Sequence, residues 1–351
     1  MSQHQRFTVL DGMRGIAAFA VMSYHMTQHT SRRLFSNAGL AVDLFFCLSG
    51  FVIAFSYLGK LKHGMTTKQY ILKRIIRLYP MYIIGLVFGF IALLIKVYEK
   101  QTNLTLFDAA SAFALNAIYL PYVSHFYVGI ANAKVQSAIF PTNDPSWSLF
   151  FELIVNILFG LIAYRARRIH FIFLAIAGAI GLALWIKITW NAQPGWGAGN
   201  IVGGLPRVFY SFFAGVVVFF LFEKFQKYIP NANPVYLILL LLVLLTFQFT
   251  AKSWLIQVIF VIPFIVLLGA KSAANNKFAI QSLDYLGWIS YPIYCIHWPV
   301  YSIFTSISGN VVSTISSLAV CVPLSLFLAH FISKKMEEPI RGYFASSLFH
   351  K

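Results

Sequence analysis

Long apolar runs repeat along this chain, and each is long enough to cross a lipid bilayer as a helix. Hydrophobic residues make up 59% of the 351 residues and charged residues only 11%, which excludes an ordinary soluble protein. The sequence therefore predicts an all-α fold, a polytopic membrane protein with about ten transmembrane helices in a single domain, 1–351. The predicted spans are roughly 8–28, 38–58, 77–97, 145–164, 169–190, 203–222, 234–250, 254–270, 285–307 and 310–333.

Basic residues lie in short clusters between the apolar runs and are divided unevenly between the two sides. With the N-terminus inside, 18 Lys and Arg residues fall on the cytoplasmic side and 8 on the other, and Arg14 lies within the first run. This excess predicts that both termini are cytoplasmic and that the longest non-spanning segment, 98–144, is extracytoplasmic. Membrane orientation thus explains the net charge of +17, and nucleic acid is not a predicted partner.

The extracytoplasmic segment 98–144 mixes amide, hydroxyl and aromatic side chains, including Tyr119, Tyr122, His125 and Tyr127. Such side chains suit contact with a sugar, and they are also common at membrane interfaces. Both interpretations stay open at this point.

The three cysteines all lie within apolar runs. They form no Cys-x-x-Cys motif and have no histidine at ligand spacing. The sequence therefore predicts neither a disulfide framework nor a metal site.

Two ionisable residues, Arg14 and His25, lie in the first apolar run, eleven positions apart. Eleven helical steps return to within about 20° of the starting direction and rise about 16 Å, so both side chains lie on one stripe at two depths. Ionisable groups within a membrane are costly, which favours a functional role for both.

Asp43 lies about five residues inside the second run and is expected at the depth of His25. A carboxylate beside an imidazole fixes its tautomer and stabilises the imidazolium, so the two residues are a candidate orienter and base. The alternative is that His25 lies at the membrane interface and that Asp43 is a helix-end polar residue. Ser49, farther along the same run, is expected to face whatever passes between the first two spans.

Arg74 and Arg77 stand three residues apart at the inner end of the third run and project from one helical face. Two guanidinium groups so placed can grip phosphate, and a cytoplasmic donor such as coenzyme A carries three phosphates. The other interpretation is anchoring at the inner membrane surface.

Polar side chains form an edge on each of two later spans. Ser148, Glu152 and Asn156 recur every four residues, and an unpaired carboxylate here requires a cation or a substrate hydroxyl as partner. Tyr291 and His297 belong to an edge of span 285–307, although a hydrogen-bonded core histidine is an alternative for His297.

Taken together, these motifs make the chain resemble the acyltransferase family 3 of integral membrane proteins. No single motif decides the matter, but six in order on the expected spans are specific. They are Arg-x10-His (Arg14, His25), Phe-Phe-x-x-Ser-Gly-Phe (Phe45 to Phe51), Arg-x-x-Arg (Arg74, Arg77), Trp-Ser-Leu-x-x-Glu (Trp147 to Glu152), Ser-Tyr-x-x-Tyr-x-x-His-x-Pro (Ser290 to Pro299) and Glu-Pro-x-Arg (Glu338 to Arg341).

The resemblance implies a ten-helix enzyme of the bacterial cytoplasmic (inner) membrane that moves an acyl group, usually acetyl from acetyl-CoA. The implied acceptor is a hydroxyl of a cell-surface or lipid-linked glycan, as for O-acetylases of O-antigen and exopolysaccharide. Its partners would be acyl-CoA, a carbohydrate and membrane lipid, with no metal. The chain is expected to be a stand-alone member.

The mechanistic hypothesis places Arg74 and Arg77 on the phosphates of acetyl-CoA, and Arg14 near its pantetheine arm. His25, held by Asp43, would deprotonate the sugar hydroxyl, and direct transfer and an acyl-enzyme relay both stay open. The other expected roles are orientation of the acceptor by Glu152, lining of the acyl-CoA passage by Ser49, and substrate binding by Trp147, Asn156, Tyr291 and His297. The rival hypothesis is a transporter or flippase, in which the same charges bind a moving ion or glycan.

Overall fold

The computed structural model describes residues 6–123, 138–308 and 313–349. Within these ranges every regular element is a helix, apart from one isolated bridge between Ala138 and Gly197, so the all-α prediction is confirmed. The elements, with η marking short π or 3₁₀ turns, are α1 (Thr8–Thr27), α2 (Gly39–Ile53), η1 (Ala54–Leu58), α3 (Gly59–Lys62), α4 (Thr67–Tyr98), α5 (Leu106–Ala117), η2 (Asp144–Ser146), α7 (Trp147–Ile162), α8 (Arg168–Thr189), α9 (Ile201–Phe225), α10 (Pro234–Thr246), α11 (Ala251–Ile256), η3 (Gln257–Val261), α12 (Ile262–Lys271), α13 (Lys277–Ile307), α14 (Thr314–Ile332), η4 (Ser333–Glu337) and α15 (Glu338–Phe349).

Seven helical stretches of the described chain are long and apolar enough to cross a membrane, so the chain is a multi-pass membrane protein. The predicted count of about ten is not confirmed. The first predicted span forms α1, which is long enough but carries Asp11, Arg14 and His25. The span predicted at 234–250 forms α10, which ends after 13 residues, about 20 Å. The seven stretches are Gly39–Lys62, Thr67–Tyr98, Asp144–Ile162, Arg168–Thr189, Ile201–Phe225, Ala251–Lys271 and Thr314–Phe344.

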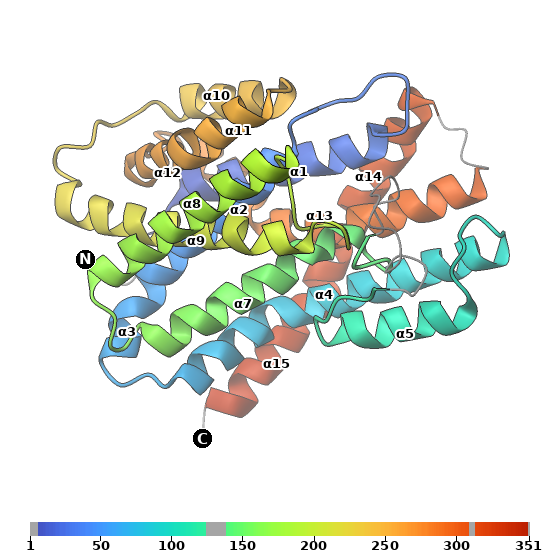
Figure 1. Cartoon of the computed structure of the whole chain (residues 1–351), viewed down its shortest axis with the longest axis horizontal. Helices are drawn as coiled ribbons and strands as arrows, with labels where there is room; N and C mark the ends of the chain where they lie inside the picture. The colour runs from blue at the N-terminus through green and yellow to red at the C-terminus, as the bar shows by residue number, and fades with distance from the viewer. Residues whose placement is uncertain (1–5, 124–137, 309–312, 350–351) are drawn as a thin grey trace.

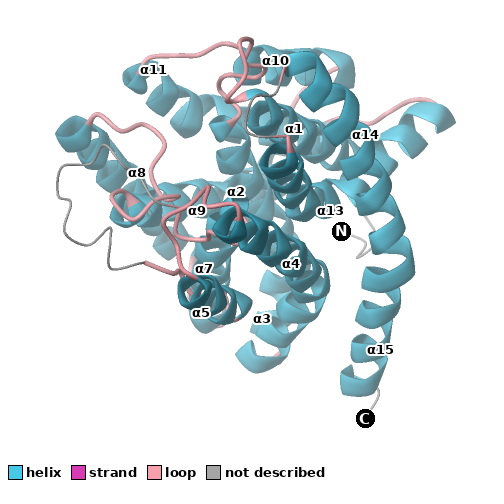
Figure 2. Cartoon of the chain, turned by 90° about the vertical axis from the view of Figure 1, so that its right-hand side faces the viewer, coloured by secondary structure: helices cyan, strands magenta, loops and turns pink. Residues whose placement is uncertain are grey.

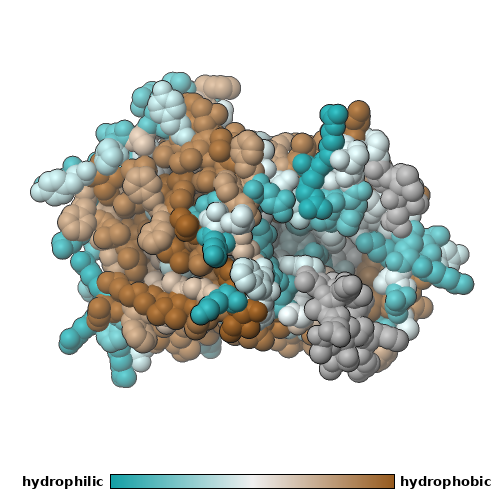
Figure 3. Space-filling view, turned by 45° about the horizontal axis from the view of Figure 1, so that its top comes forward, coloured by the Kyte–Doolittle hydropathy of each residue, from teal (hydrophilic) through white to brown (hydrophobic). Residues whose placement is uncertain are grey.

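The long helices run roughly along the longest axis of the molecule, with the N-terminus at the left of Figure 1 and the loop after α4 at the right. Figures 1 and 2 show α10 and α11 along one edge and α15 along the opposite edge. Apolar residues cover much of the face in Figure 3, and hydrophilic ones gather mainly at its two ends. This distribution suits a lipid belt between two polar surfaces, while the cytoplasmic placement of the termini stays a prediction.

The start of α4 differs from the sequence prediction. Thr66 caps the helix, because its hydroxyl accepts a hydrogen bond from the Gln69 amide (3.2 Å) while the Gln69 side chain accepts one from the Thr66 amide (3.0 Å). The helix therefore begins at Thr67, ten residues before the predicted span. Arg74 and Arg77 lie inside it and project toward the helices packed against α4.

The segment 98–144 contains α5, which packs beside α4, and a part that lies outside the described residues, including His125 and Tyr127. Asn116 of α5 is fully buried, and its amide donates to the Leu120 carbonyl and accepts from Thr142. Asn116 thus supports the fold of this segment.

The helix pairs in most extensive contact include α1 with α13 and α2 with α9. The second pair is close because each helix offers a glycine to the backbone of the other. A Cβ atom at Gly50 would overlap the Phe212 carbonyl oxygen, and one at Gly215 would overlap that of Cys47. Gly50 is therefore a packing residue, and it brings Asp43 and Ser49 of α2 against α9 and the neighbouring helices.

Gly50→Ala is expected to destabilise the protein by about 1–3 kcal/mol, because the added methyl forces α2 away from α9. The measurement is the thermal unfolding midpoint of detergent-purified protein. Gly59→Ala is the matched control, since a Cβ there meets nothing within 4 Å. Equal midpoints for the two variants would contradict the close α2–α9 approach.

Candidate active site

A cavity of about 230 Å³ lies among α1, α2, α4, α7 and α13, and we name it the arginine cavity. Four arginines and two glutamates contribute to its wall, so its electrostatic potential favours an anion. The lining residues are Arg14, Val42, Phe45, Phe46, Leu48, Ser49, Val52, Ile53, Arg74, Arg77, Leu78, Ser148, Leu149, Glu152, Gly287, Trp288, Ser290, Tyr291, Pro292, Tyr294, Glu337 and Arg341.

Arg74 is buried and held by the protein itself. Its guanidinium forms an ion pair with Glu152 (NH2 to Oε1, 3.1 Å) and donates through Nε to the Asn156 side chain at 3.2 Å. Tyr70 donates to the same Asn156 oxygen, and Ser49 donates to Glu152 at 2.8 Å. The predicted paired grip of Arg74 and Arg77 on a phosphate is therefore revised, because Arg74 organises the cavity wall.

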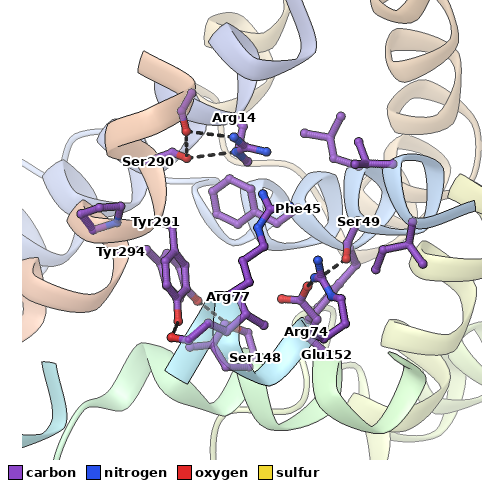
Figure 4. Close-up of a pocket in the computed structure, with 18 of the residues that line it drawn as sticks. Arg14, Phe45, Ser49, Arg74, Arg77, Ser148, Glu152, Ser290, Tyr291 and Tyr294 are labelled. Carbon is purple, nitrogen blue, oxygen red and sulfur yellow. Dashed lines mark hydrogen bonds and ion pairs between the residues drawn. The ribbon is translucent and has the colours of Figure 1, made fainter. Parts of the chain in front are cut away.

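Arg77 is the guanidinium that the cavity presents. Its side chain is exposed and lines the cavity, and it forms no hydrogen bond or ion pair with any residue that the structure describes. Figure 4 shows it extending into the cavity toward Arg14. Arg14 is instead fixed, since it donates to Ser290 (3.0 Å) and pairs with Asp11 (2.9 Å).

His25 does not contact Asp43, and we correct the predicted pair. Both oxygens of Asp43 are bound by Arg207, through Nε at 2.9 Å and NH2 at 2.8 Å, and Ser211 donates at 3.2 Å. The two charged side chains are almost completely buried, at 0% and 1% exposure. Asp43 lies on the side of α2 that faces α9, so its charge is satisfied there and stabilises the helix pair.

The partner of His25 is His297 of α13. The Nδ1 atom of His25 lies 2.9 Å from Nε2 of His297, and the two rings are nearly parallel. The other nitrogen of His297, Nδ1, lies 2.9 Å from the carbonyl oxygen of Ile293. A carbonyl can only accept, so that nitrogen carries the hydrogen, and Nε2 of a neutral His297 then accepts one from His25 Nδ1. The network assigns His25 the Nδ1–H tautomer and leaves a lone pair on Nε2.

His25 lines a second cavity of about 250 Å³, which we name the histidine cavity. The residues that line it are Val21, Tyr24, His25, Gln28, Ala38, Gly39, Val42, Asp144, Pro145, Trp147, Gln193, Trp196, Arg207 and Tyr294. Two of them, Val42 and Tyr294, also line the arginine cavity. The two cavities therefore lie back to back, with Val42 and Tyr294 between them.

Tyr294 is held in this dividing position by the start of α7. Its hydroxyl donates to the Pro145 carbonyl (2.9 Å) and lies 2.7 Å from the Ser148 hydroxyl. Its ring meets Phe45 of α2 edge to face. These contacts come from three different helices, so movement of one of them changes the barrier between the cavities.

The predicted site residues are divided by the structure into three groups. Six line the arginine cavity, two line the histidine cavity, and three line neither. Asn156 is buried between Arg74 and Tyr70 and supports the wall, so its predicted place on the substrate is corrected. The three groups are Arg14, Ser49, Arg74, Arg77, Glu152 and Tyr291, then His25 and Trp147, and finally Asp43, Asn156 and His297.

Several residues of the histidine cavity were not predicted from the sequence, among them Gln28, Asp144, Gln193 and Trp196. One carboxylate oxygen of Asp144 is buried and accepts no hydrogen bond from the described chain. Arg207, which also lines this cavity, could have been found from the sequence, because an arginine inside an apolar run requires a buried acid as its partner. That partner is Asp43.

The family of the chain follows from comparison with known proteins. A family model described as an acyltransferase domain matches residues 7–334. The chain belongs to this acyltransferase family. The match covers α1 through α14, which include the dihistidine contact, the histidine cavity and all of the arginine cavity except Glu337 and Arg341. No group of three or more His, Cys, Asp or Glu side chains within the described ranges is placed to hold a metal ion.

Two relatives extend this result. The chain is 33% identical to "Protein 2 in picA locus" of Rhizobium radiobacter over 190 residues, which is 52% of this chain and 95% of that protein. It is 23% identical to the peptidoglycan O-acetyltransferase OatA of Listeria monocytogenes over 358 residues, 95% of this chain and 55% of that protein. The chain thus spans about half the length of OatA. No solved structure matches it.

Proposed function

We propose that this membrane acyltransferase is an O-acyltransferase that moves an acetyl group from acetyl-CoA to a hydroxyl of a cell-surface or lipid-linked glycan. The observation that carries the proposal is the pair of back-to-back cavities, one lined by arginines and one by a histidine with a free lone pair. The similarity to a peptidoglycan O-acetyltransferase supports acetyl as the group and a glycan as the acceptor.

In this proposal the donor enters the arginine cavity. The free guanidinium of Arg77 binds a phosphate or polar group of coenzyme A, and Arg14, toward which Arg77 extends, lines the same cavity. The thioester then lies at the boundary formed by Val42 and Tyr294. An extended pantetheine arm can bring the acetyl group to this boundary while the nucleotide stays at the polar mouth.

The acceptor occupies the histidine cavity, where Trp147 and Trp196 offer aromatic faces and Gln28 and Gln193 offer amides. Aromatic faces with amide groups suit the apolar and hydroxyl faces of a sugar ring. His25 Nε2 accepts the proton of the attacking hydroxyl as its oxygen bonds to the acyl carbon. The carbon–sulfur bond breaks, and the proton passes from His25 to the departing thiolate.

The test uses purified full-length protein, acetyl-CoA labelled in the acetyl group, and a panel of glycans analysed by mass spectrometry. The expected result is label on a glycan with release of free coenzyme A in equal amount. Movement of intact glycan across a vesicle membrane without label transfer would instead establish the transporter or flippase.

Arg77→Met is expected to raise the KM for acetyl-CoA about 10- to 100-fold, the effect of one lost charge-assisted hydrogen bond. The kcat should fall far less, because Arg77 lies away from His25. Lys62→Met is the control, since Lys62 is exposed at the end of α3 and lines neither cavity. A changed KM for the glycan with an unchanged KM for acetyl-CoA would show that Arg77 binds the acceptor and not the donor.

A further inference from the structure

A third cavity of about 370 Å³ lies where α1, α4 and α13 end, and the reaction steps proposed above make no use of it. We name it the lysine cavity. It is lined by His29, Thr30, Lys96, Trp298, Tyr301, Ser302 and Thr305, a set with two potential cations and no acid.

Several hydrogen-bond donors reach this cavity without a partner. The Lys96 ammonium, the Tyr301 and Ser302 hydroxyls and the Trp298 ring N–H form no hydrogen bond with a described residue, and Lys96 forms no ion pair. Tyr301 and Ser302 are nevertheless only 4% and 5% exposed. These donors line the cavity and are free to pair with a bound group, so the lining suits a ligand that accepts hydrogen bonds.

The charges around the cavity point to the sign of that ligand. Burial, together with the positive charges of Arg33 and Lys96, lowers the pKa of His29 below its usual value. The Asp144 carboxylate of the histidine cavity attracts Lys96, but no ion pair joins them. A positive potential that is only partly compensated favours an anion.

Trp298 connects the lysine cavity to the proposed chemistry. Trp298 lines the cavity, and its ring meets His25 edge to face with centroids 5.2 Å apart. A group bound in the lysine cavity is therefore one side chain away from the base. A ligand too large for either cavity alone could place an anion on Lys96 and a neutral sugar beside His25.

We propose that the lysine cavity binds an anionic group, phosphate or carboxylate, of the acceptor and thereby positions a neighbouring hydroxyl at His25. Lys96 supplies the charge, and Ser302 and Tyr301 donate to the anion's oxygens. The positioning step rests on the function proposed above, whereas binding of the anion does not. The anion can come from the phosphate of a lipid carrier or from an acidic group of the glycan.

The test measures binding to the full-length protein in nanodiscs of neutral phosphatidylcholine. Inorganic phosphate, glucuronate and farnesyl phosphate are the probes, and sodium chloride at equal ionic strength is the blank. Tryptophan emission reports binding, with Trp298→Phe identifying the responding ring. We expect saturable binding that Lys96→Met weakens 10- to 100-fold and Lys96→Arg weakens less than threefold. Lys100→Met, an exposed lysine just beyond the same helix, should leave it unchanged.

The probes also separate the two sources of the anion. Tighter binding of farnesyl phosphate than of both soluble probes identifies a lipid phosphate, and tighter binding of glucuronate identifies an acidic sugar. The inference is overturned if no probe binds beyond the chloride blank, or if Lys96→Met and Lys100→Met behave alike. An unfolding midpoint within a few degrees of wild type shows that each variant is folded. If anion binding stands while acetyl transfer fails, only the proposed function is lost.

Discussion

His25→Ala is expected to lower acetyl transfer about 10²- to 10⁴-fold, the contribution of a positioned general base. The hydrogen bond to His297 leaves the lone pair of His25 on Nε2, and His25 lines the cavity proposed for the acceptor. Without this group the proposed base is absent when the hydroxyl loses its proton and the carbon–oxygen bond forms. The measurement is the initial rate with labelled acetyl-CoA at saturating donor.

His63→Ala is the matched control, because His63 is exposed at the end of α3 and lines none of the three cavities. Both variants should keep the unfolding midpoint of the wild type within a few degrees. If His25→Ala keeps an acetyl-transfer rate within threefold of wild type, His25 is not the general base.

His297 offers a sharper version of the same test, because it positions His25 and lines neither substrate cavity. His297→Gln can retain an oxygen that accepts from His25 Nδ1, whereas His297→Leu cannot. We expect His297→Leu to lower kcat with an unchanged KM for acetyl-CoA, and His297→Gln to restore part of the rate. Equal loss in both variants would show that the contact is structural only.

The sequence predicted which helix faces carry polar groups, because that property depends on spacing within one helix. Arg14, Ser49, Arg77 and Glu152 were each identified on such a face, and the structure brings all four to one cavity. The order of the six motifs along the predicted spans also indicated the resemblance to the acyltransferase family. The face and the depth of a residue depend only on its position within one helix, so both can be predicted from a single sequence.

The partners across helices could not be predicted, because they depend on how each helix is rotated about its axis. Asp43 was expected beside His25 on the ground of equal depth, but α2 turns it toward Arg207. No sequence pattern pairs His297 with His25, because 272 residues separate the two partners. The span count of about ten is not confirmed, since apolar runs such as the 13-residue α10 are shorter in the structure than the sequence predicts.

Among the contacts that differ from the sequence prediction, the Asp43–Arg207 ion pair is expected to have the largest effect on the stability of the protein. The pair is buried, and Arg207 also donates to the carbonyl oxygens of Gly39 and Pro194. Its guanidinium lies over the rings of Trp147 (5.5 Å) and Trp254 (5.2 Å). One ion pair thus joins α2, α9, α7 and α11, and it supports the wall that presents Trp147 to the histidine cavity.

Asp43→Asn and Arg207→Met are each expected to destabilise the protein by about 3–5 kcal/mol, because each leaves one charge buried without its partner. The measurement is the unfolding midpoint in detergent together with the yield of folded protein. The double variant Asp43→Leu with Arg207→Met removes both charges and should recover part of the loss. Exposed Arg168 and Glu223, paired at 2.7 Å, provide the control, since Arg168→Met should cost no more than about 1 kcal/mol. If Asp43 instead oriented His25, Asp43→Asn would leave the unfolding midpoint unchanged and would lower only kcat. The unfolding midpoint and kcat together therefore distinguish a carboxylate that orients His25 from one that holds four helices together.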